Sequence, residues 1–328
     1  MSTRWKVRPA GSNWGDFGQD DQRGRLNLID RAKVLQGIAE VHEGTTFCLS
    51  LPLDFPGGNY HNLGRRPPLV RPLRRGAALT YNLRPNVRQT DIFCDDCAEI
   101  HPHFSTHWDA LAHVGATFDA DQDGIAEVRY YNGYRGEVDN GAGGVRALGI
   151  ENMGRMGVQG RAVMIDLLGA FGSARRLVGY DDLMRAAKLT GVVVEQGDIV
   201  CLHTGQATAL LAAGRNPPVA LLEESFCHLD GCDERLLEWI DASGLALLAA
   251  DNFAVEAVPP RAVQPGRAAE PIHELCLFKL GIHLGELWYL GELNAWLCSR
   301  GRNRFLLTAP PLLLPGAVGS PVTPVATV

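Results

Sequence analysis

Residues 161–203 read RAVMIDLLGAFGSARRLVGYDDLMRAAKLTGVVVEQGDIVCLH, and this stretch indicates the fold class. Its two ends, Arg161–Leu167 and Asp198–His203, are short apolar runs typical of buried β-strands. The segment Tyr180–Leu189 between them is amphipathic, has an aspartate near its start, and is followed by Gly191, a common helix stop. A strand, a helix and a second strand in succession predict an α/β protein.

The same alternation continues on both sides of this stretch. Downstream we expect helices over Asp233–Ala242 and Leu287–Arg300, and strands over Ala246–Ala250 and Phe305–Thr308. Upstream, Asp30 is a plausible N-cap for a helix over Arg31–Val41, and a strand follows at Thr45–Leu51. Interleaved helices and strands of this kind predict one mixed sheet with flanking helices.

The composition is that of an ordinary globular protein. Of the 328 residues, 46% are apolar and 21% are charged. No linker or repeat divides the chain, so we expect a single domain over residues 1–328. The segment Phe55–Arg88, rich in Pro, Gly and Arg, is expected to lie over the body as solvated loops. Five prolines in the last nineteen residues predict an extended C-terminal tail.

Several classes of protein are disfavoured. The net charge of −6 argues against nucleic acid as a partner, since duplex binding needs a basic surface. No window approaches the roughly 20 apolar residues of a membrane span, and the first residues lack the apolar core of a signal peptide. Eight scattered cysteines, including one lone CxxC at Cys94–Cys97, indicate neither a disulfide framework nor a structural zinc site. We therefore expect a cytoplasmic protein.

Histidine is concentrated in one short segment. Four of the ten histidines fall within His101–His113, which reads HPHFSTHWDALAH. Three of them and an aspartate are separated by even numbers of residues, namely His103, His107, Asp109 and His113. A helix would split this set, whereas a straight strand would align it on one face but spread it over roughly 33 Å. We therefore expect a bend around Ser105–Ala110 that brings the four side chains together.

Such a cluster suits a divalent metal ion. Neutral imidazole and carboxylate are the ligands of Zn²⁺ and Mn²⁺, and three protein ligands leave a position open for a reactive water molecule. The alternative interpretation is a set of hydrogen-bonded histidines without an ion. Other catalytic motifs are absent from the sequence, since it contains no GxGxxG after a strand, no GxxxxGK[ST] and no GxSxG.

The segment HFSTHWDALAH (103–113) resembles the HxGTHxDxPxH signature of the cyclase/kynurenine-formamidase-like family of metal-dependent hydrolases, which includes isatin hydrolases. Ser105 stands where the signature has Gly, and Leu111 where it often has Pro. The resemblance extends from about residue 13 to the end of the sequence. It is carried by NWGDFGQDDQRGRLNLI (13–29), EQGDIVCLHTG (195–205), LAADNFAVEAVP (248–259) and PIHELCLFKLGIHLGELWYLGEL (271–293).

The resemblance implies a swivelling β/β/α domain with a mixed sheet and flanking helices, assembled as a homodimer or homotetramer. It also implies that His103, His107 and Asp109 bind a first metal. His273 and Glu286 would complete this site or bind a second ion, with Asp109 able to bridge. Glu286 could instead orient a histidine, and His283 lies close enough in sequence to be a further candidate.

The same resemblance implies that His113 is the catalytic histidine. The implied activity is hydrolysis of an amide, cyclic amide or lactone in a small-molecule substrate, by water activated on Zn²⁺ or Mn²⁺. Three alternatives stay open at this stage: ring closure on a polyketide-like substrate, a non-catalytic metal-binding module, and a structural oligomer in which the metal fixes loops.

Overall fold

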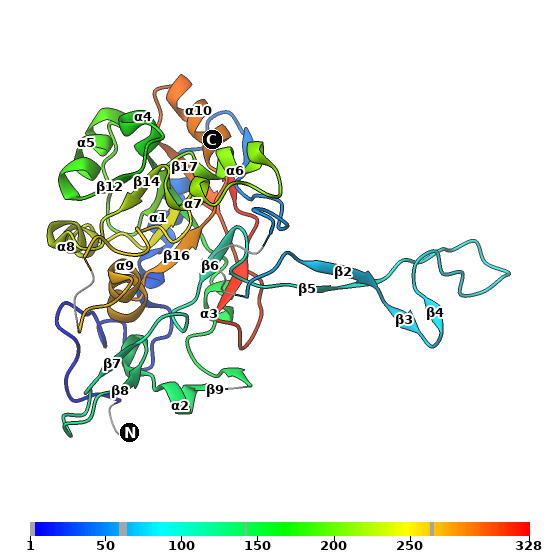
Figure 1. Cartoon of the computed structure of the whole chain (residues 1–328), viewed down its shortest axis with the longest axis horizontal. Helices are drawn as coiled ribbons and strands as arrows, with labels where there is room; N and C mark the ends of the chain where they lie inside the picture. The colour runs from blue at the N-terminus through cyan, green and yellow to red at the C-terminus, as the bar shows by residue number, and fades with distance from the viewer. Residues whose placement is uncertain (1–3, 59–63, 142, 263–265) are drawn as a thin grey trace.

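A nine-stranded mixed sheet, curled into a half-barrel, forms the centre of the molecule (Figure 1). The computed structural model describes residues 4–58, 64–141, 143–262 and 266–328. The strand order is β1 (Thr46–Cys48), β19 (Val325–Thr327), β17 (Arg304–Thr308), β11 (Gln159–Asp166), β13 (Ile199–His203), β15 (Leu247–Ala250), β16 (His283–Glu286), β6 (His107–Asp109) and β18 (Gly319–Pro321). The predicted α/β class with a mixed sheet and flanking helices is confirmed.

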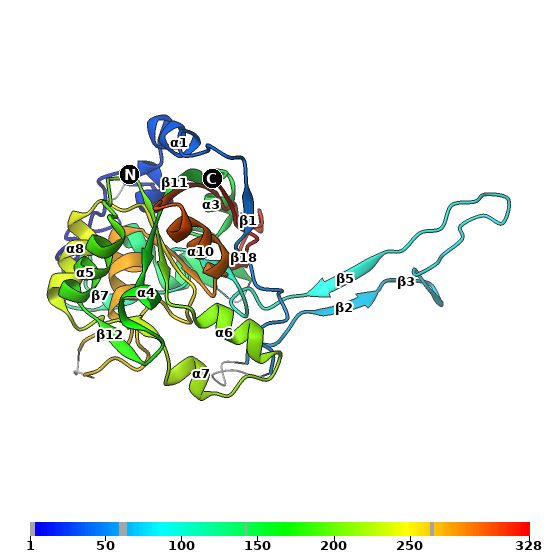
Figure 2. The same cartoon turned by 90° about the horizontal axis from the view of Figure 1, so that it is seen from above.

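The sheet is buried on both faces. Its four central strands, β11, β13, β15 and β16, run parallel, and the outer pairings are antiparallel. Along β11, Ala162 and Met164 pack into one core while Val163 and Ile165 pack into another. The first core also contains side chains of α1 (Arg31–Ile38) and α10 (Gly291–Ser299), and the second those of α5 (Tyr180–Thr190) and α8 (Glu234–Ala242). Figure 2 shows these four helices around the sheet. Burial of both faces explains why these strands are continuous apolar runs.

Helix boundaries follow the expected local chemistry. The Asp30 side chain accepts a hydrogen bond from the backbone N–H of Lys33 and so caps α1, as the sequence predicts. Gly191 ends α5 in the left-handed conformation, which glycine adopts without steric cost. The predicted helix over Leu287–Arg300 is wrong at its start, because α10 begins only at Gly291. Backbone N–H groups of Leu287 and Trp288 instead donate to Asn252 and Ala250, which continues the pairing of β16.

Shorter elements connect and flank the sheet. The helices are η1 (Gly24–Leu28), η3 (Tyr131–Gly133), α2 (Gly136–Asp139), α3 (Glu151–Gly154), α4 (Leu167–Phe171), α6 (Gln206–Ala213), α7 (Ala220–Glu223), α9 (Pro271–His273) and the π-helix η4 (Glu274–Leu280). Two-stranded ladders pair β7 (Ala116–Phe118) with β8 (Glu127–Arg129), β9 (Asn140–Gly141) with β10 (Gly144–Val145), and β12 (Arg176–Val178) with β14 (Cys227–Leu229). None of the helices among the described residues has the length and apolar character to span a bilayer.

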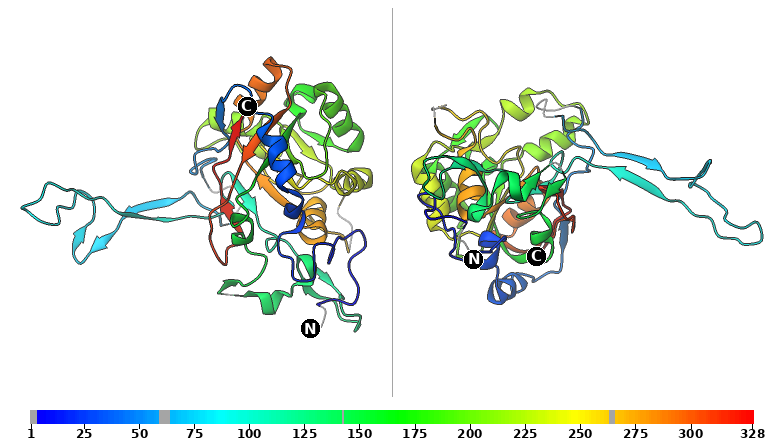
Figure 3. Two further views of the ribbon diagram at one scale, coloured as in Figure 1. Left: turned by 180° about the vertical axis from the view of Figure 1, so that it is seen from behind. Right: turned by 90° about the horizontal axis from the view of Figure 1, so that it is seen from below.

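The Pro/Gly/Arg-rich segment does not lie over the body as predicted. Residues 64–100, which we call the arm, project away from it (Figures 1 and 3). The arm is built from β2 (Leu69–Pro72) paired with β5 (Asp96–Glu99), and β3 (Arg74–Arg75) paired with β4 (Ala78–Leu79). Residues 59–63 of the predicted loop region lie outside the described residues. Alternation of prolines and arginines suggested loops, but the strands pair with each other within the arm.

Candidate metal centre

The short strand β6 carries the centre of the site. His107 and Asp109 are two residues apart, so they project from the same face of β6, and Trp108 projects from the other. β6 is paired on both sides, with Glu286 of β16 opposite His107 and Gly319 of β18 opposite Asp109. The bend predicted around Ser105–Ala110 is therefore misplaced. Pairing on both edges keeps residues 107–109 extended, and the chain turns before and after them.

The turn before β6 places His103 over the site. The Thr106 hydroxyl fixes this turn, since it accepts from the N–H of Leu51 and donates to the carbonyl of Leu287. His103 then packs against Gly319, where a Cβ would overlap its Nε2 atom. Ser105, which replaces the signature glycine, donates its hydroxyl to the carbonyl of Pro52. The substitution of serine is therefore accommodated within the turn.

The His107 ring has a defined tautomer. Its Nδ1 lies 2.7 Å from the carbonyl oxygen of Ser105. A carbonyl can only accept, so Nδ1 carries a proton, and in the neutral ring Nε2 keeps its lone pair. Burial acts to lower the pKa of His107, but Asp109 and Glu286 raise it above the usual value. That lone pair belongs to the nitrogen that faces Asp109 at 3.3 Å. The backbone thus prepares His107 as a ligand through Nε2.

The Asp109 carboxylate lies at the centre of the cluster. Its Oδ1 atom is 3.3 Å from Nε2 of His103, 3.3 Å from Nε2 of His107 and 3.8 Å from Nε2 of His113. Its Oδ2 atom is 3.8 Å from Nε2 of His273. Asp109 belongs to two sets of possible metal ligands, and within each set the ligand atoms lie within 4.8 Å of one another. One set is His103, Asp109 and His113, and the other is His107, Asp109 and Glu286.

The C-terminal half of the chain completes the cluster. His273, from α9, places Nε2 3.2 Å from Oε1 of Glu286, and Glu286 places Oε2 3.8 Å from Nε2 of His107. The structure therefore brings together all six residues that the sequence singles out. His283 is separate, because an offset of three residues along β16 puts it on the opposite face from Glu286. Burial lowers the pKa of His283 to about 3.

Glu256 is a residue of the site that sequence reasoning missed. Its carboxylate accepts from Nδ1 of His273 at 2.9 Å and from the backbone N–H groups of Ile272 and His273. The carboxylate thus fixes both the ring and the start of α9. Glu256 lies in the quoted stretch LAADNFAVEAVP, but no local pattern shows which residue it contacts.

Burial and charge set the protonation states of the cluster. Burial acts to raise the pKa of Asp109, but the charge interaction with His113 helps to hold this pKa well below its usual range. Burial lowers the pKa of His113 to about 4, although Asp109 acts to raise it. Burial also acts to lower the pKa of His273, but hydrogen bonds with Glu256 and Glu286 raise it well above the usual value. At neutral pH, Asp109 is therefore ionised and His113 is neutral.

Several polar atoms of the cluster lack the partners that burial demands. Within the described part of the chain, Nε2 of His103 and both carboxylate oxygens of Asp109 are buried without a hydrogen bond. A buried ionised carboxylate is costly unless a charge or hydrogen bonds compensate it. A divalent cation among these imidazoles and carboxylates would satisfy all three atoms. The donor set fits such an ion.

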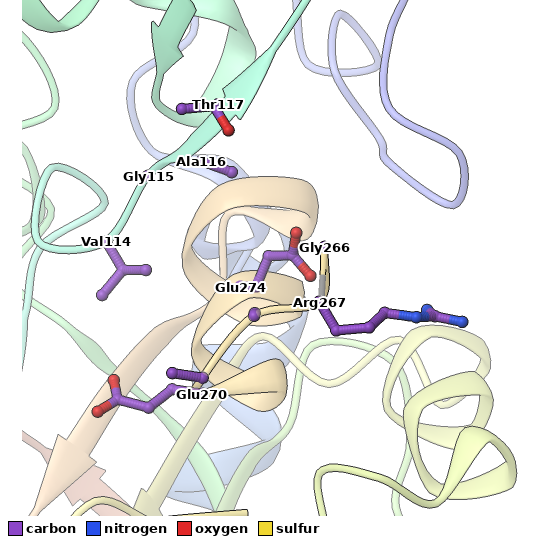
Figure 4. Close-up of a pocket in the computed structure, with 10 residues that line it drawn as sticks. Val114, Gly115, Ala116, Thr117, Gly266, Arg267, Glu270 and Glu274 are labelled. Atoms are coloured by element: carbon purple, nitrogen blue, oxygen red, sulfur yellow. The ribbon is translucent and has the colours of Figure 1, made fainter. Parts of the chain in front are cut away.

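A cavity of about 510 Å³ opens beside the cluster (Figure 4). Val114, which lines it, follows His113 directly, and Glu270 places Oε2 3.9 Å from Nδ1 of His273. In Figure 4, Val114 and Glu270 lie on one side, while the side chain of Arg267 extends away on the other. None of the six cluster residues lines this cavity. The cavity is therefore adjacent in sequence to His113 and to His273, but it does not include their side chains.

A second group of acidic residues lies outside this centre. Asp119, Asp121 and Asp123 could also hold an ion, but they are partly or fully exposed. Asp119 accepts from the backbone N–H groups of Asp123 and Gly124, and Asp121 pairs with Arg129. Asp119 and Asp121 thus have partners within the protein, although among the described residues Oδ1 of Asp121 is, like the Asp109 oxygens, buried without a hydrogen bond. The second group differs from the Asp109 cluster in its greater exposure and in having no imidazole ligand.

Comparison with known proteins places the chain among related sequences and structures. Residues 53–257 match the family described as "Putative cyclase". A crystal structure described as a novel cyclase is 30% identical, covers 98% of this chain and 100% of its own, and superposes with a TM-score of 0.79. A comparison with curated proteins gives no match.

More distant structures share the fold. Isatin hydrolase A from Labrenzia aggregata, bound to benzyl benzoate, is 16% identical, with coverage of 90% of this chain and 98% of its own and a TM-score of 0.57. A structure described as a predicted metal-dependent hydrolase from Bacillus stearothermophilus is 15% identical, with coverage of 87% and 98% and a TM-score of 0.50. At these identities the likeness concerns the fold alone.

Proposed function

The chain belongs to the family described as "Putative cyclase", and from this membership we propose that it is a metal-dependent hydrolase of a small molecule. The observation that carries the proposal is the Asp109 carboxylate, which is buried, ionised and without a hydrogen bond at the point where four imidazoles converge. Distant relatives in fold are described as isatin hydrolases and as a metal-dependent hydrolase, which supports the same reaction class.

In this proposal, His103, His107 and Asp109 hold one ion, Zn²⁺ or Mn²⁺. His273 and Glu286 would complete its coordination or hold a second ion together with Asp109, whose Oδ1 lies 3.3 Å from Nε2 of His103 and of His107 and whose Oδ2 lies 3.8 Å from Nε2 of His273. A bound ion of this kind supplies Lewis acidity, which polarises a carbonyl oxygen and acidifies a water molecule. Glu256 keeps His273 in place through its hydrogen bond to Nδ1.

His113 is the proposed acid/base. Its pKa of about 4 keeps the ring neutral at physiological pH, so Nε2 can accept a proton from the attacking water. The same ring then returns the proton to the departing nitrogen or oxygen. The stacked ring of His103, with centroids 4.2 Å apart, fixes the orientation of His113. The cavity beside Val114 would admit the substrate to this ring.

The proposed scissile bond is an amide, cyclic amide or lactone. We further propose that residues 1–328 act as one domain of the swivelling β/β/α type in the cytoplasm, as a homodimer or homotetramer. The extended C-terminal segment contributes β18 and β19 to the sheet. Gly319 of β18 contacts the metal cluster, so this segment would be part of the functional unit rather than an appendage.

The test is a panel of N-formyl aromatic amines, isatin-like cyclic amides and lactones, assayed with purified protein before and after chelation. The proposal expects hydrolysis of at least one class, loss of the rate on chelation, and recovery when Zn²⁺ or Mn²⁺ is added back. Circular dichroism should show an unchanged fold in the chelated protein. Hydrolysis that survives complete removal of metal would contradict the proposal, and unfolding on chelation would instead indicate a structural ion.

A further inference from the structure

We propose that the arm, residues 64–100, binds the body of a second copy of this chain. The arm is the part of the molecule least able to exist alone in water. Its ladder has only two strands, and two-stranded hairpins are marginally stable in water without a further layer. Thr80 is its one buried residue. A covering surface is therefore needed to hold the arm in its extended form.

The exposed side chains of the arm are those of an interface. Of the twenty large apolar side chains exposed among the described residues, eight lie on these 37 residues. Val87 is 80% exposed, and Val70, Ile92 and Phe93 are each at least half exposed. A concentration of apolar side chains on a projecting element marks a surface that another protein covers. Scattered single apolar residues elsewhere on the body need no such explanation.

The net charges of the arm and of the body indicate that the protein covering the arm is a second copy of the chain. The arm carries seven arginines and four acidic residues, a net charge of +3. Because the whole chain carries −6, the remainder carries −9. A basic, apolar arm is thus complementary to the acidic body of another copy, and each copy offers both surfaces. In a symmetric pair, each arm would reach the partner's body, which closes the assembly.

The distribution of charge within the arm disfavours pairing of arms with each other. All seven arginines lie on the outgoing segment, residues 65–88, and all four acidic residues lie on the returning segment, residues 91–99. A two-fold axis would bring like strand edges together, so arginines would face arginines or carboxylates would face carboxylates. Like charges on paired edges are repulsive. Binding to the body avoids this repulsion.

The root of the arm adjoins the metal centre. Arg65 donates through Nη1 to the carbonyl oxygen of His103 at 3.1 Å, and β5 ends at Glu99, four residues before His103. The arm and the candidate ligands are thus joined at the point where the chain enters the body. The proposal itself does not depend on the hydrolase activity, since it rests on the surface of the arm.

The first test is sedimentation of the full chain at micromolar concentration, compared with the triple variant Val87→Ser/Ile92→Ser/Phe93→Ser. The wild type should be dimeric or larger, and the variant monomeric with an unchanged circular dichroism spectrum. A matched control, Leu35→Ser/Leu189→Ser/Val193→Ser, removes three exposed apolar side chains from the body and should stay assembled. A monomeric wild type, or an arm variant that assembles as the wild type does, would overturn the proposal.

Three further measurements test whether the arm binds the body of a second copy. Charge reversal by Arg74→Glu/Arg75→Glu should weaken assembly at least tenfold, and added salt should weaken that of the wild type. A benzophenone side chain placed at position 87 should cross-link, in a band of dimer mass, to peptides outside residues 64–100. Cross-links confined to arm peptides, or to a different protein, would overturn the assignment to the body of a second copy.

Discussion

The candidate metal centre and the arm are adjacent in sequence but differ in which side chains they bury and expose. Between residues 103 and 113 the chain buries charged and polar groups, and several of their atoms have no hydrogen bond. Between residues 64 and 100 it exposes apolar side chains to water. Burial of charged groups without hydrogen bonds and exposure of apolar side chains to water are both energetically unfavourable. In our proposals, a cation supplies the partner in the first region and a second copy of the chain supplies it in the second.

The largest expected effect is that of Asp109→Asn. The change removes the negative charge that all the surrounding imidazoles contact, so the ion should be lost. Loss of Lewis acidity removes several kcal/mol of transition-state stabilisation, roughly 10³-fold in rate or more. Metal analysis and steady-state kinetics check both consequences. The matched change on the arm, Asp91→Asn, should leave metal content and rate as in the wild type.

His113→Ala separates proton transfer from metal binding. Removal of a general acid/base costs roughly 10²–10⁴-fold in rate. Because His103, His107, Asp109, His273 and Glu286 remain, the variant should keep its metal. Elemental analysis beside the rate measurement decides the role. If the metal is lost together with the rate, His113 is a ligand in the set it shares with His103 and Asp109, and the assignment as acid/base is wrong.

Glu256→Gln tests the support of His273. The amide cannot replace the carboxylate at both Nδ1 and the backbone N–H groups, so the ring loses its fixed orientation. Loss of such an orienting partner typically costs 10–100-fold in metal affinity or activity. A competition titration with a chelator of known affinity measures the change. The matched control is Glu99→Gln on the arm, which should keep the metal affinity of the wild type. Equal metal affinity in the Glu256→Gln and Glu99→Gln variants would show that Glu256 has no role in orienting His273.

The smallest expected effect concerns stability in acid. The pKa of His283 is about 3 in the folded protein and roughly 6.5 when unfolded, so the unfolded state binds the extra proton. Folding stability therefore falls as pH drops from about 6.5 toward 3, by up to about 1.4 kcal/mol per pH unit for this group. The arm contains no histidine and cannot contribute in this way. Urea unfolding of metal-free protein between pH 7 and 5 should show a shallower dependence in His283→Leu.

The sequence predicted the parts of the site that are local. Even spacing placed His107 and Asp109 on one face, and apolar runs located β11, β13 and β15 within two residues of their ends. Glu286 could be assigned only through the family resemblance, because its position opposite His107 depends on the register between β16 and β6. No pattern within the sequence reports a register between strands so far apart.

The failures have a common physical origin. Glu256 contacts His273 across seventeen residues, and an isolated glutamate in an apolar run carries no sign of its partner. The chain beyond β16 was expected to be helical from Leu287, but backbone pairing with Asn252 and Ala250 overrides the helical pattern there. For the arm, composition indicated solvent exposure correctly, yet nothing local shows whether a paired segment lies on the body or projects from it.

The central claim is that the buried Asp109 cluster, rather than a surface site, holds the ion. Anomalous diffraction from crystals of the metal-loaded protein locates the ion directly. The account predicts a peak within about 2.0–2.2 Å of an Asp109 oxygen and of Nε2 of His103 and His107. A peak at Asp119, Asp121 and Asp123 with none at Asp109 would contradict it, as would crystals that show no peak at either position after loading.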